Sequence, residues 1–446
     1  PELSGTPLPV RKLTPIFVCM QVMLRFRISL WITVLTGCLL LALLTGLPLP
    51  MWLAVPLATI TSPDLLILEA MLFGIMVLSG VQGATGQSRR LVESIERYIR
   101  WPRIRLVIFP AMVGFLPMPG GALFSCPMLE AASQGMNISP RRKTLINYWF
   151  RHIWEVSWPL YPGYVLVSSL LGLPLTTLMK YTFPLVILAF CTGWFFLLRD
   201  IKPEVRSCAS GADAGSLGPT EPENDTKQRG SLGEILYEAL PLIITLAGAG
   251  VFGFILGRLS PSVPGQASFI ISAFLGAGTA IWQGRGRLGK SLTKIAFSLD
   301  MLRMLMLMVA IYLFKDIIAA SGIIAEISHI GGSKLLIVAL CILLPLFCGM
   351  LIGVMVGYVG ACFPILLGVI EQAGMQEYTL PLLVLALVSG NVGMLFTPLH
   401  ICLVVTCEYF KVTFADILRG LSGPLLAHLC CGISWGALLF AAGAHV

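Results

Sequence analysis

Three ionisable side chains lie close together in the otherwise apolar stretch 144–171: Arg151, His152 and Glu155. Charged groups are costly to bury in apolar surroundings, and they usually face a cavity or a partner. Glu155 is therefore a candidate proton carrier or cation ligand, and Arg151 and His152 are candidates to attract an anion. The alternative is structural, because Arg151 and Glu155 stand one helical turn apart and could neutralise each other as an ion pair.

The same stretch is interrupted at residues 158–163, which include Pro159, Tyr161 and Pro162. Two prolines and a glycine cannot keep the hydrogen bonds of a helix intact, so we predict a break there. The N-terminus of a half-helix can hold an anionic group, and unwound carbonyl groups can hold a cation. Pro159 and Tyr161 are thus candidate binding residues. A packing kink is the alternative.

A second polar interruption is expected in the apolar stretch 380–407, at residues 389–393 and 397–398. It places hydroxyl and amide groups where only apolar side chains would be cheap to bury. An amide oxygen can replace one water around a cation, and its NH₂ group can donate to a substrate oxygen. The candidate substrate or ion contacts here are Ser389, Asn391, Gly393, Thr397 and His400.

Glu69 lies in the middle of another apolar segment, residues 65–82, and has no obvious local partner. A carboxyl group in that environment suits proton coupling. Glu69 therefore joins Glu155 as a proton-coupling candidate, with a partner on another helix as the alternative.

Helices that span a membrane must position these residues. The chain has 446 residues, of which 57% are hydrophobic and only 12% charged, too few polar residues to cover a soluble globule of this size. Several apolar stretches approach the roughly 20 residues that a helix needs to cross a bilayer, and no alternating strand pattern is found. We predict an all-α polytopic membrane protein with lipid as its solvent and nine spans, at residues 30–46, 65–82, 144–171, 178–198, 232–256, 267–282, 300–320, 380–407 and 421–442.

Two further apolar regions, residues 104–135 and 335–374, are interrupted at their middles, at 117–121 and 353–360. We predict both to be re-entrant hairpins whose tips reach the candidate site. The tip residues that join the site are Gly120, Gly121 and Gly360.

The two halves of the chain are related by an internal repeat. An ungapped offset of 239 residues aligns six glycine pairs: 37 with 276, 83 with 322, 114 with 353, 121 with 360, 135 with 374 and 193 with 432. Each half has the order span, span, hairpin, broken span, span, and one unpaired helix between them reverses the direction of the second half. We therefore predict inverted repeats, which are typical of secondary transporters.

The predicted order is a cytoplasmic segment 1–27, a first repeat 28–198 with hairpin 104–135 and broken helix 144–171, and a polar cytoplasmic linker 199–231. A connecting helix 232–257 and a second repeat 267–443 follow, with hairpin 335–374 and broken helix 380–407. Positive charge concentrates on the cytoplasmic side of membrane proteins, and this order leaves Lys180, Arg258, Lys315 and Lys334 outside while most of the 30 Lys and Arg residues lie inside. The expected location is the cytoplasmic (inner) membrane, with the N-terminus in the cytoplasm and the C-terminus external.

Several function classes are not supported by the residues. The 12 cysteines lie mostly in apolar segments without a CxxC pair, so we expect neither a metal site nor a disulfide framework. The net charge of +8 is spread between apolar segments, which does not indicate nucleic-acid binding. No nucleophile elbow, HExxH motif or phosphate loop occurs, so we predict no enzyme, no cofactor and no ATP-driven transport by this chain alone.

The run 389–400, Ser-Gly-Asn-Val-Gly-Met-Leu-Phe-Thr-Pro-Leu-His, followed by Glu-Tyr-Phe-Lys at 408–411, resembles an uncharacterised family of prokaryotic integral membrane proteins. The resemblance extends to the ion-transporter superfamily of citrate, gluconate, dicarboxylate, arsenite and sodium/proton carriers. It implies an elevator-like fold in which hairpin tips and broken helices surround the substrate. The hairpin tips of this chain lack the Ser-Asn-Thr of the dicarboxylate carriers, so dicarboxylate is not the expected solute.

The leading hypothesis is an ion-coupled secondary transporter, a symporter or antiporter that moves a small anionic solute with Na⁺ or H⁺. One alternative is a sodium/proton antiporter without an organic substrate. A second alternative is a membrane assembly subunit that transports nothing. The expected partners are the bilayer and a small solute or ion, and a homodimer is left open.

Overall fold

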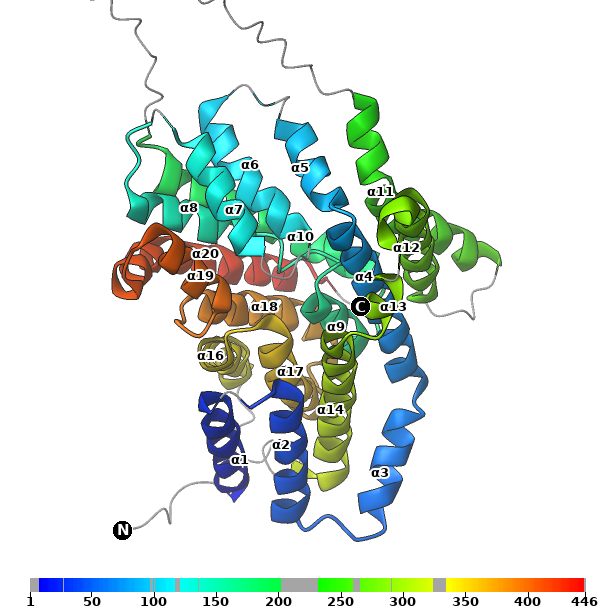
Figure 1. Ribbon diagram of the computed structural model, residues 1–446. Helices are drawn as coiled ribbons and strands as arrows, with labels where there is room; N and C mark the ends of the chain where they lie inside the picture. Colours follow the sequence, from blue (N-terminus) through cyan, green and yellow to red (C-terminus); the bar gives the residue numbers. More distant parts are fainter. Residues whose placement is uncertain are drawn as a thin grey trace, which may run out of the picture.

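The computed structural model describes residues 8–26, 28–96, 99, 101–116, 121–134, 136–201, 232–259, 265–289, 291–323 and 334–444. All regular elements in these residues are helices, and nine of the described helices are long and apolar enough to cross a membrane. The chain is therefore an all-helical, polytopic protein, as its sequence predicted (Figure 1).

The helices of the first half run in chain order through Figure 1 from blue to green. They are α1 (Leu8–Arg25), α2 (Leu30–Thr45), α3 (Met51–Ile60), α4 (Pro63–Ala84), α5 (Gln87–Glu96), α6 (Pro102–Phe115), α7 (Gly121–Ala132), α8 (Pro140–His152), α9 (Pro162–Leu170), α10 (Leu175–Gly193) and a π-helical turn η1 (Trp194–Leu198).

The helices of the second half begin after the predicted linker. They are α11 (Leu232–Leu259), α12 (Ala267–Leu288), α13 (Ser291–Ala296), α14 (Leu299–Ser321), α16 (Lys334–Ile352), α17 (Met355–Gln372), the 3-10 turn η2 (Gln376–Tyr378), α18 (Thr379–Leu395), α19 (Ile401–Phe410) and α20 (Phe414–Ala441).

Local sequence signals explain where several helices start. The Ser62 and Ser139 side chains each accept a hydrogen bond from a backbone N–H of the first turn of α4 and of α8, and a proline follows each serine. Serine satisfies an otherwise free N–H there, and proline has no N–H to leave unsatisfied. Ser298 and Thr413 cap α14 and α20 in the same way.

The nine long helices differ in two places from the nine predicted spans. The predicted span 30–46 is the 16-residue helix α2, and the predicted span 144–171 is divided between α8 and α9. The two helices that replace them in the count are α16 and α17, which form the predicted hairpin 335–374. This region thus contains two helices that are each as long as a membrane span, whereas α6 and α7 of the other predicted hairpin are shorter.

The predicted interruption at 353–360 is wrong beyond its first two residues, because α17 already begins at Met355. The turn is made by Gly353, whose φ of 73° lies in the left-handed region that favours glycine. Gly357 and Gly360 are ordinary helical positions of α17 that lie close to neighbouring side chains, and a Cβ on Gly360 would overlap Ile311 of α14. These glycines serve close packing and not a loop.

Residues 8–25, which belong to the segment predicted to be cytoplasmic, form helix α1. This helix packs against α2, with Ile16 and Met20 buried, and a Cβ on Gly37 of α2 would overlap the Met20 sulfur (Figure 1). Because the connection between α1 and α2 is short, the two helices are antiparallel. The Leu8 end of α1 therefore lies at the same end of this pair as Thr45.

Helices of the two halves pack against one another in crossed pairs. Helix α2 packs against α14, and α4 packs against α12. Within each half, in contrast, α6 packs against α8, and α16 packs against α18. Helix α7 then contacts α19 from the other half, as α17 contacts α9, so the two halves interlock around their broken helices (Figure 1).

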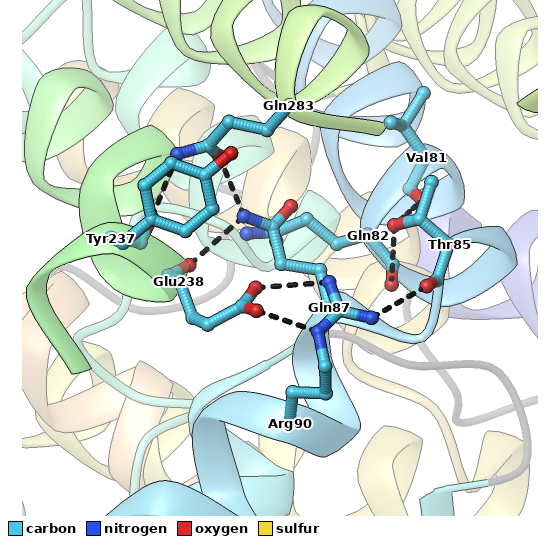
Figure 2. A network of polar contacts seen from close by, with 8 residues as sticks. All are labelled: Val81, Gln82, Thr85, Gln87, Arg90, Tyr237, Glu238 and Gln283. Atoms are coloured by element: carbon cyan, nitrogen blue, oxygen red, sulfur yellow. Dashed lines mark hydrogen bonds and ion pairs between the residues drawn. The ribbon is translucent and has the colours of Figure 1, made fainter. Parts of the chain in front are cut away.

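A polar network joins the α4–α5 corner to helices α11 and α12 (Figure 2). The Arg90 guanidinium donates to both carboxylate oxygens of Glu238, at 2.6 and 3.0 Å, and to the Thr85 carbonyl at 2.9 Å. The Gln87 side-chain amide nitrogen Nε2 donates to the Glu238 carbonyl and to Gln283 Oε1. A bidentate pair of this kind fixes both position and orientation, so the network holds the corner against the connecting helix.

Glu238→Gln tests this network, because it removes the negative charge opposite Arg90 while keeping the side-chain shape. A hydrogen bond to a charged group contributes about 1.5–3 kcal/mol, and Arg90 keeps part of its solvation, so we expect a loss of about 1–2 kcal/mol. The measurement is the apparent melting temperature of the purified protein in detergent. Glu93→Gln is the matched control, since its partner Arg89 is largely exposed, and it should leave the melting temperature unchanged. Equal melting temperatures for Glu238→Gln and the unmodified protein would contradict the prediction.

Candidate functional site

The first predicted helix break is present. Helix α8 ends at His152, the chain turns through residues 153–161, and α9 begins at Pro162 with Tyr161 as its N-cap residue. Pro162 occupies the first helical position, where its missing N–H costs nothing, and Pro159 lies in the turn. The local sequence rule therefore located this break correctly.

The second break lies further along the chain than predicted. Helix α18 continues through Ser389, Asn391 and Gly393 to Leu395, and the break comprises residues 396–400. The Ser389 hydroxyl donates to the Leu385 carbonyl of its own helix at 2.9 Å, and the Thr397 hydroxyl accepts from the Leu399 N–H within the break at 3.3 Å. The expected interruption at 389–393 is thus wrong, whereas the one at 397–398 is right.

Close packing against α16 and α17 explains the two glycines that mimicked a break. A Cβ on Gly393 would overlap the Leu346 carbonyl oxygen, and a Cβ on Gly349 would overlap the Gly390 carbonyl oxygen. Small residues let two membrane helices approach backbone to backbone. Gly393 therefore serves contact between α18 and α16, and Gly390 leaves room for the Tyr358 ring of α17, while Pro398 and its neighbours end the helix.

The two breaks meet in the interior of the protein. The Nε2 atoms of His152 and His400 are 2.9 Å apart, and Asn391 Nδ2 lies 3.5 Å from Glu155 Oε2. All four residues are buried, with exposed fractions of 2% to 8%. Residues that the sequence placed in separate halves thus form one polar cluster at the broken helices.

Side chains of the site satisfy carbonyl groups at the ends of helices α6, α16 and α18. The Tyr161 hydroxyl donates to the Gly114 carbonyl near the end of α6, and His400 Nδ1 donates to the Gly353 carbonyl just after α16, at 2.6 Å. The Tyr148 hydroxyl donates to the Leu395 carbonyl at the end of α18, at 3.2 Å. The last carbonyls of a helix have no partner within it, and no water is available at membrane depth.

Arg151 does not make the predicted ion pair with Glu155. Helix α8 ends before Glu155, so the helical spacing that would bring the two side chains together is lost. The Arg151 Nε and Nη1 atoms are buried and have no hydrogen-bond partner among the described residues. The guanidinium lies beside Gly121, the first residue of α7, where a Cβ would overlap Nη2. A guanidinium with two buried donors, unpaired among the described residues, thus lies beside the N-terminus of a helix.

The other predicted site residues are distributed unevenly. Gly121 adjoins Arg151, whereas Gly360 packs against α14 and makes no polar contact with the breaks. Gly120 lies outside the described residues. Glu69 lies on α4, and its Oε1 atom is buried without a hydrogen-bond partner in the described part of the chain. Helix α4 packs against α9, but no hydrogen bond or ion pair among the described residues links Glu69 to the broken helices.

Cys402 belongs to the site, although the sequence analysis treated it as one of several apolar cysteines. It lies in the first turn of α19, and its Sγ atom and one nitrogen each of His152 and His400 all lie within 4.8 Å of one another. The spacing His400-x-Cys402 directly after Thr397-Pro398 is the signal that could have indicated it. The partner His152 is distant in sequence, so no short motif revealed the group.

A small cavity adjoins the cluster. It is lined mainly by apolar side chains together with His152, Asn391 and His428. His428 lies on α20, and its Nδ1 atom is buried without a hydrogen-bond partner among the described residues. The breaks therefore have a neighbouring space with polar groups at its wall.

No curated protein matches the chain. A family model described as "Protein of unknown function (DUF401)" matches residues 9–214 and 269–440, which include both broken helices. The match covers most of the chain, so the protein belongs to this family of unknown function.

Proposed function

We propose that this protein is an ion-coupled secondary transporter that moves a small anionic solute across a membrane, with Na⁺ or H⁺ as the coupling ion. The observation that carries the proposal is the meeting of two helix breaks, with Arg151, Glu155, His152, Asn391 and His400 gathered where they touch. Broken helices whose ends surround polar groups within a membrane are the usual substrate sites of secondary transporters.

The packing of the helices supports inverted repeats. Adding 239 to residue numbers of the first half places α2 on α12, α4 on α14, α6 on α16 and α8 on α18. The crossed pair α2 with α14 then corresponds to α12 with α4, and α7 with α19 corresponds to α17 with α9. Helix α1 likewise overlaps α11, and each of them packs on the helix that follows it. Two pseudo-symmetric halves can exchange conformations and expose one site to each side in turn.

Equivalent hydrogen bonds at the two breaks support the same relation. Tyr161 and His400 are 239 residues apart, and each is the N-cap residue of the second half of a broken helix. Their acceptors, the carbonyls of Gly114 and Gly353, are also 239 residues apart. A side chain at the same repeat position thus donates to the equivalent glycine carbonyl at both breaks, although the donor differs in residue type.

The proposed movement is of the elevator type. The hairpins and broken helices, α6 to α9 and α16 to α19, would move together against α2, α4, α12 and α14. The interface between the two groups includes the contacts of α17 with α14 and of α9 with α4. Gly360 lies at this interface against Ile311, where the absence of a side chain lets α17 and α14 pack closely.

Arg151 is the residue that favours an anionic solute. Its free Nε and Nη1 donors are buried, so a solute oxygen that accepted from them would replace missing hydrogen bonds. The N-terminus of α7 beside the guanidinium carries a partial positive charge, which adds to the attraction. We propose that a carboxylate or an oxyanion of similar size binds between Arg151 and α7.

Asn391 and Glu155 are proposed to hold the coupling ion. A carboxylate and an amide oxygen are suitable ligands for Na⁺, and a carboxyl group can carry H⁺. Glu69 is a second candidate proton carrier, although it lies on α4 and not at the breaks.

For the membrane orientation, we propose that the linker is cytoplasmic and that the C-terminus is external, in the inner membrane. This follows from the distribution of Lys and Arg residues. The cytoplasmic placement of residues 1–27 is not part of this proposal, because α1 runs antiparallel to α2 beside it.

Purified protein in liposomes tests the function. Imposed Na⁺ and H⁺ gradients are combined with a panel of small organic and inorganic anions, which are preselected by thermal shift with and without Na⁺. Uptake that depends on both a solute and a gradient supports the proposal. Proton exchange without any solute would favour a sodium/proton antiporter, and activity in neither assay would favour a membrane assembly subunit.

Asn391→Ala should remove solute-dependent transport while the protein still folds. A hydrogen bond to a charged group contributes about 1.5–3 kcal/mol, so we expect at least a roughly tenfold loss of the initial uptake rate. Asn147→Ala is the matched control, because the Asn147 amide is also buried on a broken helix but donates to Cys126 and Thr406. The control should lower the melting temperature and leave ion dependence unchanged. Uptake by Asn391→Ala at the unmodified rate would exclude Asn391 from the site.

Glu155→Gln should change the dependence of transport on pH or on Na⁺, because it keeps the side-chain shape and removes the charge. Uptake rates are measured across a series of pH values and Na⁺ concentrations. Glu69→Gln is measured in parallel and should retain the unmodified profile. If Glu69→Gln alone shifts the profile, the coupling carboxyl group is Glu69 and the role given to Glu155 is wrong.

A further inference from the structure

Three side chains at the meeting point of the two breaks have the chemistry of metal ligands. His152 is the last residue of α8, His400 is the N-cap residue of α19, and Cys402 lies in the first turn of α19. One imidazole nitrogen from each histidine and the Cys402 Sγ atom all lie within 4.8 Å of one another. Both histidines are almost completely buried, at 3% and 5% exposure.

The hydrogen bonds of the two histidines determine which nitrogens face each other. His152 Nδ1 lies 2.5 Å from the Tyr148 carbonyl oxygen, and His400 Nδ1 lies 2.6 Å from the Gly353 carbonyl oxygen. A carbonyl oxygen only accepts, so both Nδ1 atoms carry the proton. In neutral rings, both Nε2 atoms are then bare acceptors, and they point at each other across 2.9 Å.

Two lone pairs at this distance repel each other unless a positive species lies between them. Histidines that ligate metals typically donate their other ring nitrogen to a carbonyl or carboxylate, which fixes the tautomer and orients the ring. Both histidines here already have that second hydrogen bond. The sulfur of Cys402 is the third ligand atom beside them, and a proton shared by two imidazoles would not require it.

We propose that His152, His400 and Cys402 bind Zn²⁺. Zinc takes nitrogen ligands at about 2.0–2.1 Å and a thiolate at about 2.3 Å in tetrahedral geometry, which places two nitrogens about 3.3 Å apart. The two Nε2 atoms are 2.9 Å apart, so a small outward shift of the rings gives the two nitrogens this spacing, and the Cys402 Sγ atom would have to move in from within 4.8 Å. A linear two-coordinate ion would instead need the nitrogens about 4 Å apart.

The surroundings of the three ligands suit a thiolate-bound cation. Cys402 is at the N-terminus of α19, where the helix dipole favours the thiolate form. Arg151 on α8 and Glu155 in the first break are the charged groups nearest to the cluster, and they carry opposite charges. Three protein ligands leave the fourth zinc position open to a water or a solute.

Zinc at this position would join the end of α8 to the start of α19, and so the two halves of the protein. Binding there does not depend on transport, and the site can be tested on protein that moves no solute. A failure to find zinc would leave the proposed transport function untouched.

Metal binding to the purified full chain tests the proposal. Protein freed of metal with a chelator is titrated with Co²⁺, which reports a thiolate ligand through a charge-transfer band in the near ultraviolet. Zinc affinity is then measured by competition with a chromogenic chelator. We expect stoichiometric binding, a thiolate band and a higher melting temperature with Zn²⁺, because a ligand that binds only the folded state stabilises it.

Cys402→Ser should abolish the charge-transfer band and weaken zinc binding by at least about 100-fold, since changes outside the ligand shell already cost 10- to 100-fold. Cys407→Ser is the matched control, because Cys407 is a buried cysteine of the same helix outside the ligand group, and it should bind as the unmodified protein does. Equal zinc affinity in Cys402→Ser and Cys407→Ser would overturn the assignment of Cys402.

A measurement on the unmodified chain covers the case in which Cys402→Ser fails to fold. Zinc should protect Cys402 from alkylation, as read by peptide mass spectrometry, while the labelling of exposed Cys430 stays the same. If neither Co²⁺ nor Zn²⁺ binds and Cys402 labels equally with and without metal, the proposal is wrong and a shared proton accounts for the histidine pair.

Discussion

The constraint on which the structure depends is that a backbone polar group inside a membrane must find its partner within the protein. Two helices are interrupted in this chain, at residues 153–161 and 396–400, and each interruption frees carbonyl groups that lipid cannot satisfy. Tyr148 donates to one such carbonyl, that of Leu395 at the end of α18, and Tyr161 and His400 donate to the Gly114 and Gly353 carbonyls at the ends of α6 and α16. The breaks are therefore maintained by contacts between separate parts of the chain, and this requirement draws the two halves together.

Two arginine side chains of this protein differ in how many of their donors have a partner. At the α4–α5 corner, the Arg90 guanidinium has a bidentate carboxylate partner in Glu238 and a carbonyl partner in Thr85, as expected of a group that stabilises a fold (Figure 2). At the breaks, Arg151 keeps two buried donors without a partner in the described residues. Departures from full satisfaction are typical of functional sites, because a ligand can supply the missing contacts.

The sequence by itself determined the class of the protein and most of its elements. The excess of apolar residues requires lipid as solvent, and seven of the nine predicted spans coincide with long apolar helices or contain one. Pro159 and Pro162 with the adjacent Gly163 located the first break, and Pro398 lies in the second. Single prolines such as Pro110 and Pro241 lie inside continuous helices, so one proline does not by itself mark a break. The sequence also identified the polar residues of the site, because an ionisable or amide side chain is costly to place in an apolar segment however the helices are arranged. These residues are Arg151, His152, Glu155, Asn391 and His400.

Tertiary structure alone decided how these residues are used. Gly390, Gly393 and Gly360 look like breaks in the sequence, yet they lie within helices, because glycine serves close helix packing as well as turns. Arg151 and Glu155 have the spacing of an ion pair, which the end of α8 at His152 removes. Cys402 joins His152 and His400 only through a contact between residues about 250 positions apart. Contacts between distant segments depend on packing, and local sequence patterns contain no information about them.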